Sequence, residues 1–288
     1  MSSLSGRELA ADIRAGTAAQ AAELAAAGHP PRLAVVTATA DEASAWYVRS
    51  LAAAAAKVGV GCEIIDLVPA IAAGSAESGR VAASIEAALA ELSGSPGVHG
   101  IIAATPLPGG IRLAGLAGAI DPAKDVDGAN PVSLGRLMTG LPAFAPATAE
   151  AVLRLLDHYQ IALEGQHAVV VGRSAVVGKP LVHLLLDRDA TVTVCHSRTR
   201  NLAAITVQAD VLVVAAGRAG LIGTEHVAPG ATVIDVGTNA TPDGGLAGDV
   251  DGGVEQVAGA LSPVPGGVGP VTTALLLRHV SEAAARFR

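Results

Sequence analysis

Residues His167–Thr199 read HAVVVGRSAVVGKPLVHLLLDRDATVTVCHSRT, and this stretch decides the fold. Ala168–Val171 is a short run rich in β-branched residues, which is typical of a strand buried on both faces. Gly172 and Gly178 bound the turn that follows, an apolar helical run comes next, and Ala190–Cys195 is a second β-rich run. The order strand, glycine turn, helix and strand predicts a dinucleotide-binding βαβ unit, in which helix N–H groups meet a pyrophosphate.

The glycine turn has the spacing G-x-S-x-x-x-G rather than the standard G-x-G-x-x-G. A glycine turn in some other parallel α/β protein is therefore the alternative, because open α/β folds host many functions. On the dinucleotide interpretation, we expect the turn to contact the cofactor through Gly172, Arg173, Ser174, Val177 and Gly178.

The end of the second strand bears on which cofactor is bound. An NAD site usually places Asp or Glu there to bind the ribose hydroxyls. Here the strand runs into CHSRTR at Cys195–Arg200, which contains no acid. Ser197, with Arg173, Arg198 or Arg200, would suit a 2′-phosphate, because guanidinium and hydroxyl groups both donate to phosphate oxygens. A solvated basic loop is the alternative, and the sequence favours NADP over NAD.

Composition narrows the class of protein. A chain of 288 residues is long enough for one large domain or two ordinary ones. The formal net charge of −7 argues against non-specific nucleic-acid binding, which needs a basic surface. Cys62 and Cys195 lie far apart and form no CxxC pair, so neither a zinc site nor a disulfide framework is indicated.

Targeting signals are also missing from the sequence. The stretch MSSLSGRELAADIR at residues 1–14 carries acids and lacks the apolar core of a signal peptide. No run approaches the roughly 18 apolar residues of a membrane span. We therefore expect a soluble cytoplasmic protein with no membrane or nucleic-acid partner.

Strand and helix patterns alternate along the whole chain, which predicts a mostly parallel sheet. The expected fold class is α/β with two domains: a Rossmann-type parallel sheet with helices, and an amino-terminal α/β domain with a cleft between the two. The boundaries that we expect are 1–147 for the amino-terminal domain, joined by a carboxy-terminal helix at 271–288, and 148–270 for the Rossmann domain. Asp121–Leu137 and Gly237–Asp251 are expected to be loops.

Short segments spread over nearly the full chain resemble the bifunctional methylenetetrahydrofolate dehydrogenase/cyclohydrolase family. In chain order they are Tyr47-Val48, Pro106-Leu107-Pro108, KDVDG from Lys124, GRSAVVGKP from Gly172, TVTVCHSRT from Thr191, VIDVGTN from Val233, GDVD from Gly248 and PVPGGVGP from Pro263.

The resemblance implies a site and a pair of reactions. NADP would enter from the Rossmann side and folate would lie along the amino-terminal domain, in a cleft between domains. The implied reactions are hydride removal from methylene-tetrahydrofolate and hydrolysis of methenyl- to formyl-tetrahydrofolate. The family also implies a homodimer formed through the Rossmann domains, and Thr238 in the VIDVGTN segment would join the cofactor site.

On the folate side, the resemblance makes Tyr47 and Asp127 the candidate catalytic and substrate-binding residues. Asp127 would accept the N–H donors of the pterin ring, although a solvated loop acid is the alternative. Tyr47 would stack on or hydrogen-bond the ligand, although a helical tyrosine is often half-buried packing. The PVPGGVGP segment would contribute Pro265, Gly266, Gly267 and Val268 to substrate binding, or else simply form a tight turn.

The departures from the family all concern the folate side. The family's helix carries Y-x-x-x-K, with the lysine central to hydrolysis, and here Leu51 occupies the lysine position. Ala104 stands where the family has the glutamine that orients that lysine. Further changes are Ala129 and Asn130 after KDVDG, and Ala147 in the family's P-C-T-P turn.

No other residue replaces the missing lysine. Arg49 does not deprotonate at accessible pH. Lys57 lies ten residues after Tyr47, so it falls on a different face of the predicted helix from Tyr47. Our first hypothesis is an NADP-dependent methylenetetrahydrofolate dehydrogenase with a weak or absent cyclohydrolase step. The second is a repurposed paralogue or a non-catalytic NADP or folate binder. The third is an intact bifunctional enzyme with a rearranged base.

Overall fold

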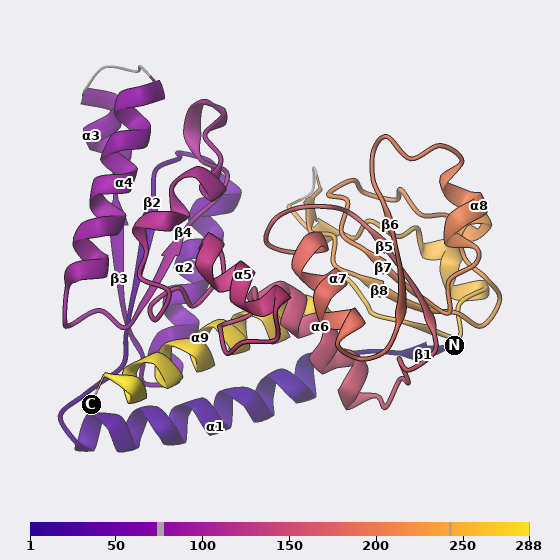
Figure 1. Ribbon diagram of the computed structural model, residues 1–288, viewed down its shortest axis with the longest axis horizontal. Coiled ribbons are helices and arrows are strands. Elements are labelled where there is room, and N and C mark those ends of the chain that lie inside the picture. Colours follow the sequence, from indigo (N-terminus) through magenta and orange to yellow (C-terminus); the bar gives the residue numbers. More distant parts are fainter. Residues whose placement is uncertain (74–77, 242–243, 288) are drawn as a thin grey trace. The chain divides into compact units, whose positions relative to one another are not determined.

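The computed structural model describes residues 1–73, 78–241 and 244–287 (Figure 1). The chain divides into two compact units. We call Met1–Ala11 with Pro146–Thr272 the Rossmann unit, and Asp12–Ala145 with Thr273–Arg288 the small-sheet unit. Residues 1–11, which we placed in the amino-terminal domain from sequence, group here with the Rossmann unit, because Ser2 and Ser3 pair with Ala260 and Leu261 of its sheet.

Within the described residues, the Rossmann unit contains one parallel sheet of six strands in the order β1-β11-β8-β7-β5-β6. The fold class predicted from the sequence is therefore confirmed. The strands are β1 (Ser2–Ser3), β5 (His167–Val171), β6 (Thr191–Cys195), β7 (Val211–Val214), β8 (Thr232–Asp235) and β11 (Ala260–Leu261). The helices are α6 (Ala147–His158), α7 (Gly178–Leu186) and α8 (Leu202–Thr206), with short 3-10 turns η4 (Thr224–His226) and η5 (Gly252–Gln256).

The strand order reverses beside β5. The chain passes from β5 through α7 to β6 on one side, and then crosses back to β7 on the other side of β5. In open parallel sheets, ligands bind outside the carboxyl ends of the strands at such a switch point. The predicted glycine turn follows β5 directly, so it lies at this position.

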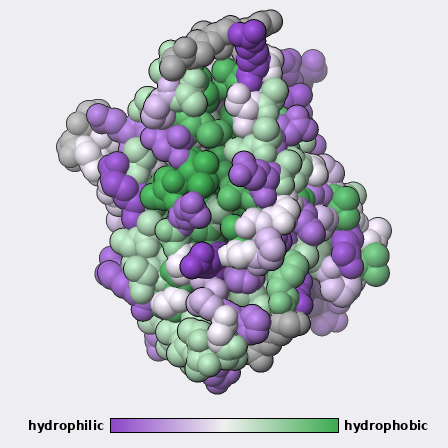
Figure 2. All heavy atoms as spheres, turned by 90° about the vertical axis from the view of Figure 1, so that its left-hand side faces the viewer, coloured by the Kyte–Doolittle hydropathy of each residue, from purple (hydrophilic) through white to green (hydrophobic). Residues whose placement is uncertain are grey.

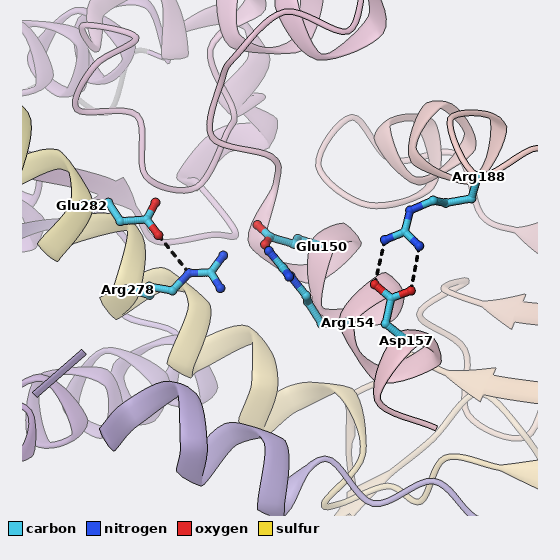
Figure 3. Close-up of polar contacts among 6 residues, drawn as sticks. All are labelled: Glu150, Arg154, Asp157, Arg188, Arg278 and Glu282. Atoms are coloured by element: carbon cyan, nitrogen blue, oxygen red, sulfur yellow. Dashed lines mark hydrogen bonds and ion pairs between the residues drawn. The ribbon is translucent and has the colours of Figure 1, made fainter. Parts of the chain in front are cut away.

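The central strands are apolar on both faces, as the sequence predicts for a sheet covered by helices. On one face, Val169 and Leu212 are fully buried in one hydrophobic cluster, and on the other face Val170, Val213 and Ile234 are fully buried as well. Outside the sheet, the guanidinium of Arg188 donates two hydrogen bonds of 2.7 Å to the carboxylate of Asp157 in α6 (Figure 3). Both side chains are partly exposed, so this pair contributes at most about 1 kcal/mol.

The small-sheet unit has, in its described part, a parallel sheet in the order β3-β2-β4. Its strands are β2 (Arg32–Thr37), β3 (Gly61–Asp66) and β4 (Gly100–Ala103), and its helices are α2 (Glu42–Lys57), α3 (Val68–Ala73), α4 (Ser78–Gly94) and α5 (Pro131–Met138). Three 3-10 turns precede α5: η1 (Pro108–Gly110), η2 (Leu113–Gly115) and η3 (Ala117–Ala119). Helices α1 (Arg7–Ala26) and α9 (Val268–Arg286) each begin in the Rossmann unit and continue into this one.

One hydrophobic cluster fills the space between this sheet and α4. It includes the buried side chains of Val36, Ile85, Leu89 and Ile101. Figure 2 looks from the side on which α3 and α4 lie in Figure 1, and hydrophobic residues gather on that face between hydrophilic ones. The edge strand β3 carries one exposed apolar residue, Ile64.

Two segments that we expected to be loops contain regular structure. The expectation for Asp121–Leu137 is wrong over α5, which begins at Pro131 because the Asn130 side chain accepts a hydrogen bond of 2.6 Å from the Val132 N–H. Within Gly237–Asp251, β9 (Asn239–Ala240) and β10 (Leu246–Ala247) form a short antiparallel pair. The helix α5 and the pair of strands β9 and β10 are too short to show a periodic pattern in the sequence.

We expect Gly178→Ala to destabilise the protein by about 2 kcal/mol, the usual cost of overpacking. A Cβ at Gly178 would meet the backbone of Gly172 and Arg173, which has no side-chain freedom to yield. The measurement is urea unfolding followed by circular dichroism. Gly252→Ala is the matched control in the same unit, since a Cβ there meets nothing within 4 Å. Equal stability of the two variants would contradict the prediction.

Candidate functional site

The core-facing side of α2 includes Leu51, the residue that the resemblance in the sequence places at the family's lysine position. Ser44, Val48, Leu51, Ala55 and Val58 are buried at the spacing of one helix face. Leu51 is 1% exposed and belongs to the largest fully buried side chains. The leucine is therefore a core residue.

Tyr47 lies on the margin of this face. The residue is 36% exposed as a whole. The pKa of its hydroxyl is nevertheless raised well above its ordinary value, first by desolvation and then by the negative charge of Asp127. The structure thus brings together the two folate-side candidates, and it keeps the phenol of Tyr47 protonated at neutral pH.

The KDVDG loop is held by the side chains that precede Asp127. Lys124 is almost fully buried and donates hydrogen bonds of 2.8 and 2.6 Å to the carbonyls of Ser93 and Ser95. Asp125 is fully buried and accepts from the N–H groups of Ala129 and Asn130 at 2.9 and 2.8 Å.

The helix α9 fixes the same loop from another side. His279 is 2% exposed, and its Nδ1 lies 2.8 Å from the carbonyl oxygen of Val126, so that nitrogen donates. Asp127 is half-buried, whereas Lys124, Asp125 and Val126 are buried. The loop therefore presents the carboxylate of Asp127 from a rigid backbone.

The other positions at which we expect a departure from the family are buried. Ala104 is 3% exposed, and its N–H donates 2.8 Å to the carbonyl of Val36. Ala129 is buried on the Asp125 loop, and Ala147 is buried at the start of α6. None of these alanines has a polar side-chain atom to offer a substrate.

On the Rossmann side, the glycine turn closes onto the first turn of α7. The hydroxyl of Ser174 accepts from the N–H groups of Val177 and Gly178 at 3.1 and 3.4 Å. Gly172 has a φ of 142° and lies against Ala215 so closely that any Cβ would clash with its carbonyl oxygen. Arg173 and Ser174 are exposed. This is the geometry of an anion-binding helix N-terminus at the switch point.

The loop after β6 presents the residues predicted for a 2′-phosphate. The Gly172 N–H donates 2.9 Å to the carbonyl of Cys195, so the glycine turn and this loop leave the sheet side by side. The His196 Nδ1 accepts from the Arg198 N–H at 3.1 Å, which shapes the loop. Ser197 and Arg198 are exposed, as are Arg200 and, after β8, Thr238.

The last predicted segment follows β11. Pro265 is exposed, whereas Gly266, Gly267 and Val268 are buried. The Gly266 carbonyl accepts from the Gly6 N–H at 2.9 Å, so the start of the chain holds this turn in place. Within the described ranges, no cluster of three or more His, Cys, Asp or Glu side chains could hold a metal ion.

The sequence predicts no role for a second set of buried carboxylates. Asp249 and Asp251 fall in the expected loop Gly237–Asp251, and Asp235 ends the strand before it. Asp235 accepts from the N–H groups of Gly237, Asp249 and Val250 at 2.8 to 3.0 Å, and burial raises the pKa of its carboxyl. The run VIDVG, an acid that ends a buried strand, was the available signal.

These features define a class: a two-unit α/β protein with a Rossmann-type dinucleotide site at the carboxyl edge of its larger sheet. Residues 4–127 match the family model "Tetrahydrofolate dehydrogenase/cyclohydrolase, catalytic domain", and residues 146–288 match its "NAD(P)-binding domain". The chain belongs to the tetrahydrofolate dehydrogenase/cyclohydrolase family, which confirms the resemblance found in the sequence.

Curated relatives and solved structures agree with this assignment. The chain is 60% identical over 284 residues to "Bifunctional protein FolD 1" of Saccharopolyspora erythraea, covering 98% of this chain and 94% of that one. It is 55% identical to "Bifunctional protein FolD" of Nocardia farcinica, covering 99% and 98%. FolD from Campylobacter jejuni superposes with a TM-score of 0.92 at 36% identity, covering 99% of both chains.

A further solved structure is the FolD of Trypanosoma brucei, complexed with NADP cofactor and inhibitor. It has a TM-score of 0.88 at 33% identity and covers 98% of this chain and 96% of that one. In the part of this chain that the structure describes, no helix is long and apolar enough to cross a membrane.

The raised pKa of Tyr47 predicts a loss of stability at alkaline pH. The folded protein holds the phenolic proton more tightly than the unfolded chain, so folding is favoured less as the pH rises past the unfolded value of about 10. We expect the melting temperature of the wild type to fall relative to Tyr47→Phe only above that pH. Thermal unfolding from pH 7 to 11 measures it, and a pH-independent difference would contradict the assignment.

Proposed function

We propose that this protein oxidises methylene-tetrahydrofolate to methenyl-tetrahydrofolate with NADP, and that its cyclohydrolase step is weak or absent. The weak or absent cyclohydrolase step is supported by Leu51, whose side chain is fully buried in the core and which, by resemblance, stands at the position of the family's lysine. The names of the relatives support the dehydrogenase reaction, and the bound NADP of the trypanosome protein supports the cofactor.

The residues of the Rossmann unit fit NADP. The helix α7 offers N–H groups and the positive end of its dipole to a pyrophosphate beside the Gly172 turn. Ser197 and Arg198 stand exposed at the end of β6, where an NAD site would have an acid. When bound, the nicotinamide supplies the hydride acceptor, and the protein needs only to align it with the folate carbon.

The folate side keeps binding groups but lacks a base for hydrolysis. The carboxylate of Asp127 is suited to the N–H donors of a pterin, and the neighbouring phenol of Tyr47 is suited to hydrogen bonding or stacking. Hydrolysis needs a group that exchanges protons near neutral pH as water adds to the methenyl carbon. Leu51 and Ala104 have no such atom, and the phenol of Tyr47 keeps its proton.

The buried alanines favour a second candidate, a paralogue that acts on another small substrate or only binds NADP or folate. Ala104, Ala129 and Ala147 all remove side-chain bulk relative to the family. Calorimetric titration with tetrahydrofolate separates the two functions, because tight folate binding counts against a new substrate. We further propose the family's homodimer through the Rossmann unit and a cytoplasmic location.

The first test is absorbance-monitored turnover of purified protein with methylene-tetrahydrofolate and NADP. We expect NADPH to form while the methenyl product accumulates. Methenyl-tetrahydrofolate added directly should hydrolyse only at the uncatalysed rate. A normal cyclohydrolase rate would disprove the missing-base argument, and no turnover with NADP or NAD would favour the second candidate.

The double variant Leu51→Lys with Ala104→Gln tests the cause of the missing step. We expect it to hydrolyse methenyl-tetrahydrofolate measurably while the dehydrogenase rate stays within a few-fold. Leu51→Lys alone should lower the free energy of unfolding by about 3 kcal/mol, because a buried ammonium loses its hydration. Leu51→Met is the matched control for packing, and it should restore no hydrolysis.

The 2′-phosphate assignment is tested by Arg198→Ala. We expect KM for NADP to rise about 10-fold or more, the effect of losing a charged hydrogen-bond donor, while KM for NAD stays constant. Arg136→Ala, an arginine of α5 in the small-sheet unit, is the control and should change neither value. Parallel increases for both cofactors would show that Arg198 does not read the 2′-phosphate.

A further inference from the structure

The carboxylate of Asp249 binds one loop through three successive peptide N–H groups. Its Oδ2 accepts from Ala216 and Gly217 at 2.6 and 2.8 Å, and its Oδ1 accepts from Arg218 at 2.8 Å. The amide of Asn239 adds a further donor to Oδ1 at 2.9 Å. Asp249 is fully buried, while Ala216, Gly217 and Arg218 are exposed. An interior carboxylate thus dictates the orientation of a surface loop.

This loop lies at the switch point of the sheet. It follows β7 directly, and β7 is the neighbour of β5 on the side away from β6. The carbonyl oxygen of Ala215 sits against Gly172, the first residue of the glycine turn. A dinucleotide that places its 2′-phosphate on the β6 side therefore has its other half on the β7 side.

The geometry of the peptide bond then fixes which polar groups the loop offers. Within a trans peptide, the C=O of one residue points opposite to the N–H of the next. The N–H groups of Ala216, Gly217 and Arg218 point to Asp249, so the carbonyls of residues 215–217 point away from it. Over the ranges that the structure describes, no donor bonds the carbonyls of Ala216 and Gly217.

We propose that Asp249 is a positioning residue for the dinucleotide. By holding the N–H groups of the loop, it orients the carbonyls of Ala216 and Gly217 so that they accept hydrogen bonds from the nicotinamide riboside half. Carbonyl oxygens accept from amide N–H and hydroxyl donors, which the carboxamide and the ribose of that half carry. The same carbonyls do not suit a phosphate, since they offer no donors. This inference rests on the proposed NADP binding, but not on turnover.

The neighbouring acid Asp235 fixes the backbone of the segment that carries Asp249. It accepts from the N–H of Asp249 itself at 3.0 Å and from Val250 at 3.0 Å, which fixes the backbone that carries Asp249. At Gly248 any Cβ would clash with the carboxylate of Asp235. The segment GDVD is thereby held against the end of β8, and the loop after β7 inherits that rigidity.

The test compares whole NADPH with the adenosine half alone, 2′,5′-ADP, by calorimetric titration of the full-length protein. For Asp249→Asn we expect the affinity for NADPH to fall about 10-fold or more, because an amide NH₂ would face N–H donors and release the loop. The affinity for 2′,5′-ADP should stay within two-fold. A general loss of structure would lower the affinity for both ligands. A loss for NADPH alone therefore distinguishes a positioning role from misfolding.

Asp251→Asn is the matched control, since the Asp251 carboxylate accepts from the Gly253 N–H of η5 and not from the N–H groups of residues 216–218 that Asp249 binds. It should change neither affinity. If Asp249→Asn does not fold, Asn239→Ala removes one side-chain donor only and should weaken NADPH in the same direction by a smaller factor.

Two results would overturn the inference: unchanged NADPH affinity in the Asp249→Asn or Asn239→Ala protein, or an equal loss for NADPH and 2′,5′-ADP. A wild type that binds NADPH without oxidising methylene-tetrahydrofolate would instead contradict the proposed function, and the Asp249 comparison would stand independently.

Discussion

Buried carboxylates that accept backbone N–H groups are the interaction on which the site depends. Asp125 holds the loop that carries Asp127, and Asp249 holds the loop after β7. Desolvation opposes this arrangement, and it raises the pKa of Asp125 and of Asp235. Hydrogen bonds to the ionised form act in the opposite direction and stabilise the charge. Both loops have their backbone fixed in this way, although residues 216–218 are exposed and the KDVDG loop is mostly buried around Asp127.

The same constraint bears on the proposed loss of the cyclohydrolase step, which would leave the fold intact. Of the expected departures from the family, Leu51 lies inside α2, and Ala104 follows β4 and donates its N–H to the carbonyl of Val36. Leucine at position 51 continues an apolar face that already includes Val48 and Ala55, so it packs where a lysine would need a polar partner. The loop of Asp127 is held by hydrogen bonds of Lys124, Asp125 and His279, none of which involves Leu51. On the proposed function, a change at position 51 would therefore leave the Asp127 loop in place.

The sequence predicted the parallel α/β class because its strands are short β-branched runs, and the glycine turn because two glycines bound it. By resemblance, counting from Tyr47 also puts Leu51 at the family's lysine position, and this stays a prediction. The sequence did not reveal that Leu51 is fully buried, which depends on the face of α2 that meets the core. It missed α5, where the local signal was the Asn130-Pro131 pair and the helix is only eight residues long.

The Asp249 network was beyond sequence reasoning for a different reason. Its partners Ala216, Gly217 and Arg218 contribute only backbone N–H groups, which any non-proline residue would supply. The pattern of side chains therefore carries no trace of the contact. Only the three-dimensional path of the chain brings residue 249 beneath residues 216–218, 31 to 33 positions earlier. A cofactor surface made of peptide carbonyls is preserved when exposed side chains change, as long as the carboxylate beneath it remains. On this proposal, the position of the nicotinamide riboside half depends on Asp249, a buried acid that acts through the loop and not by direct contact with the ligand.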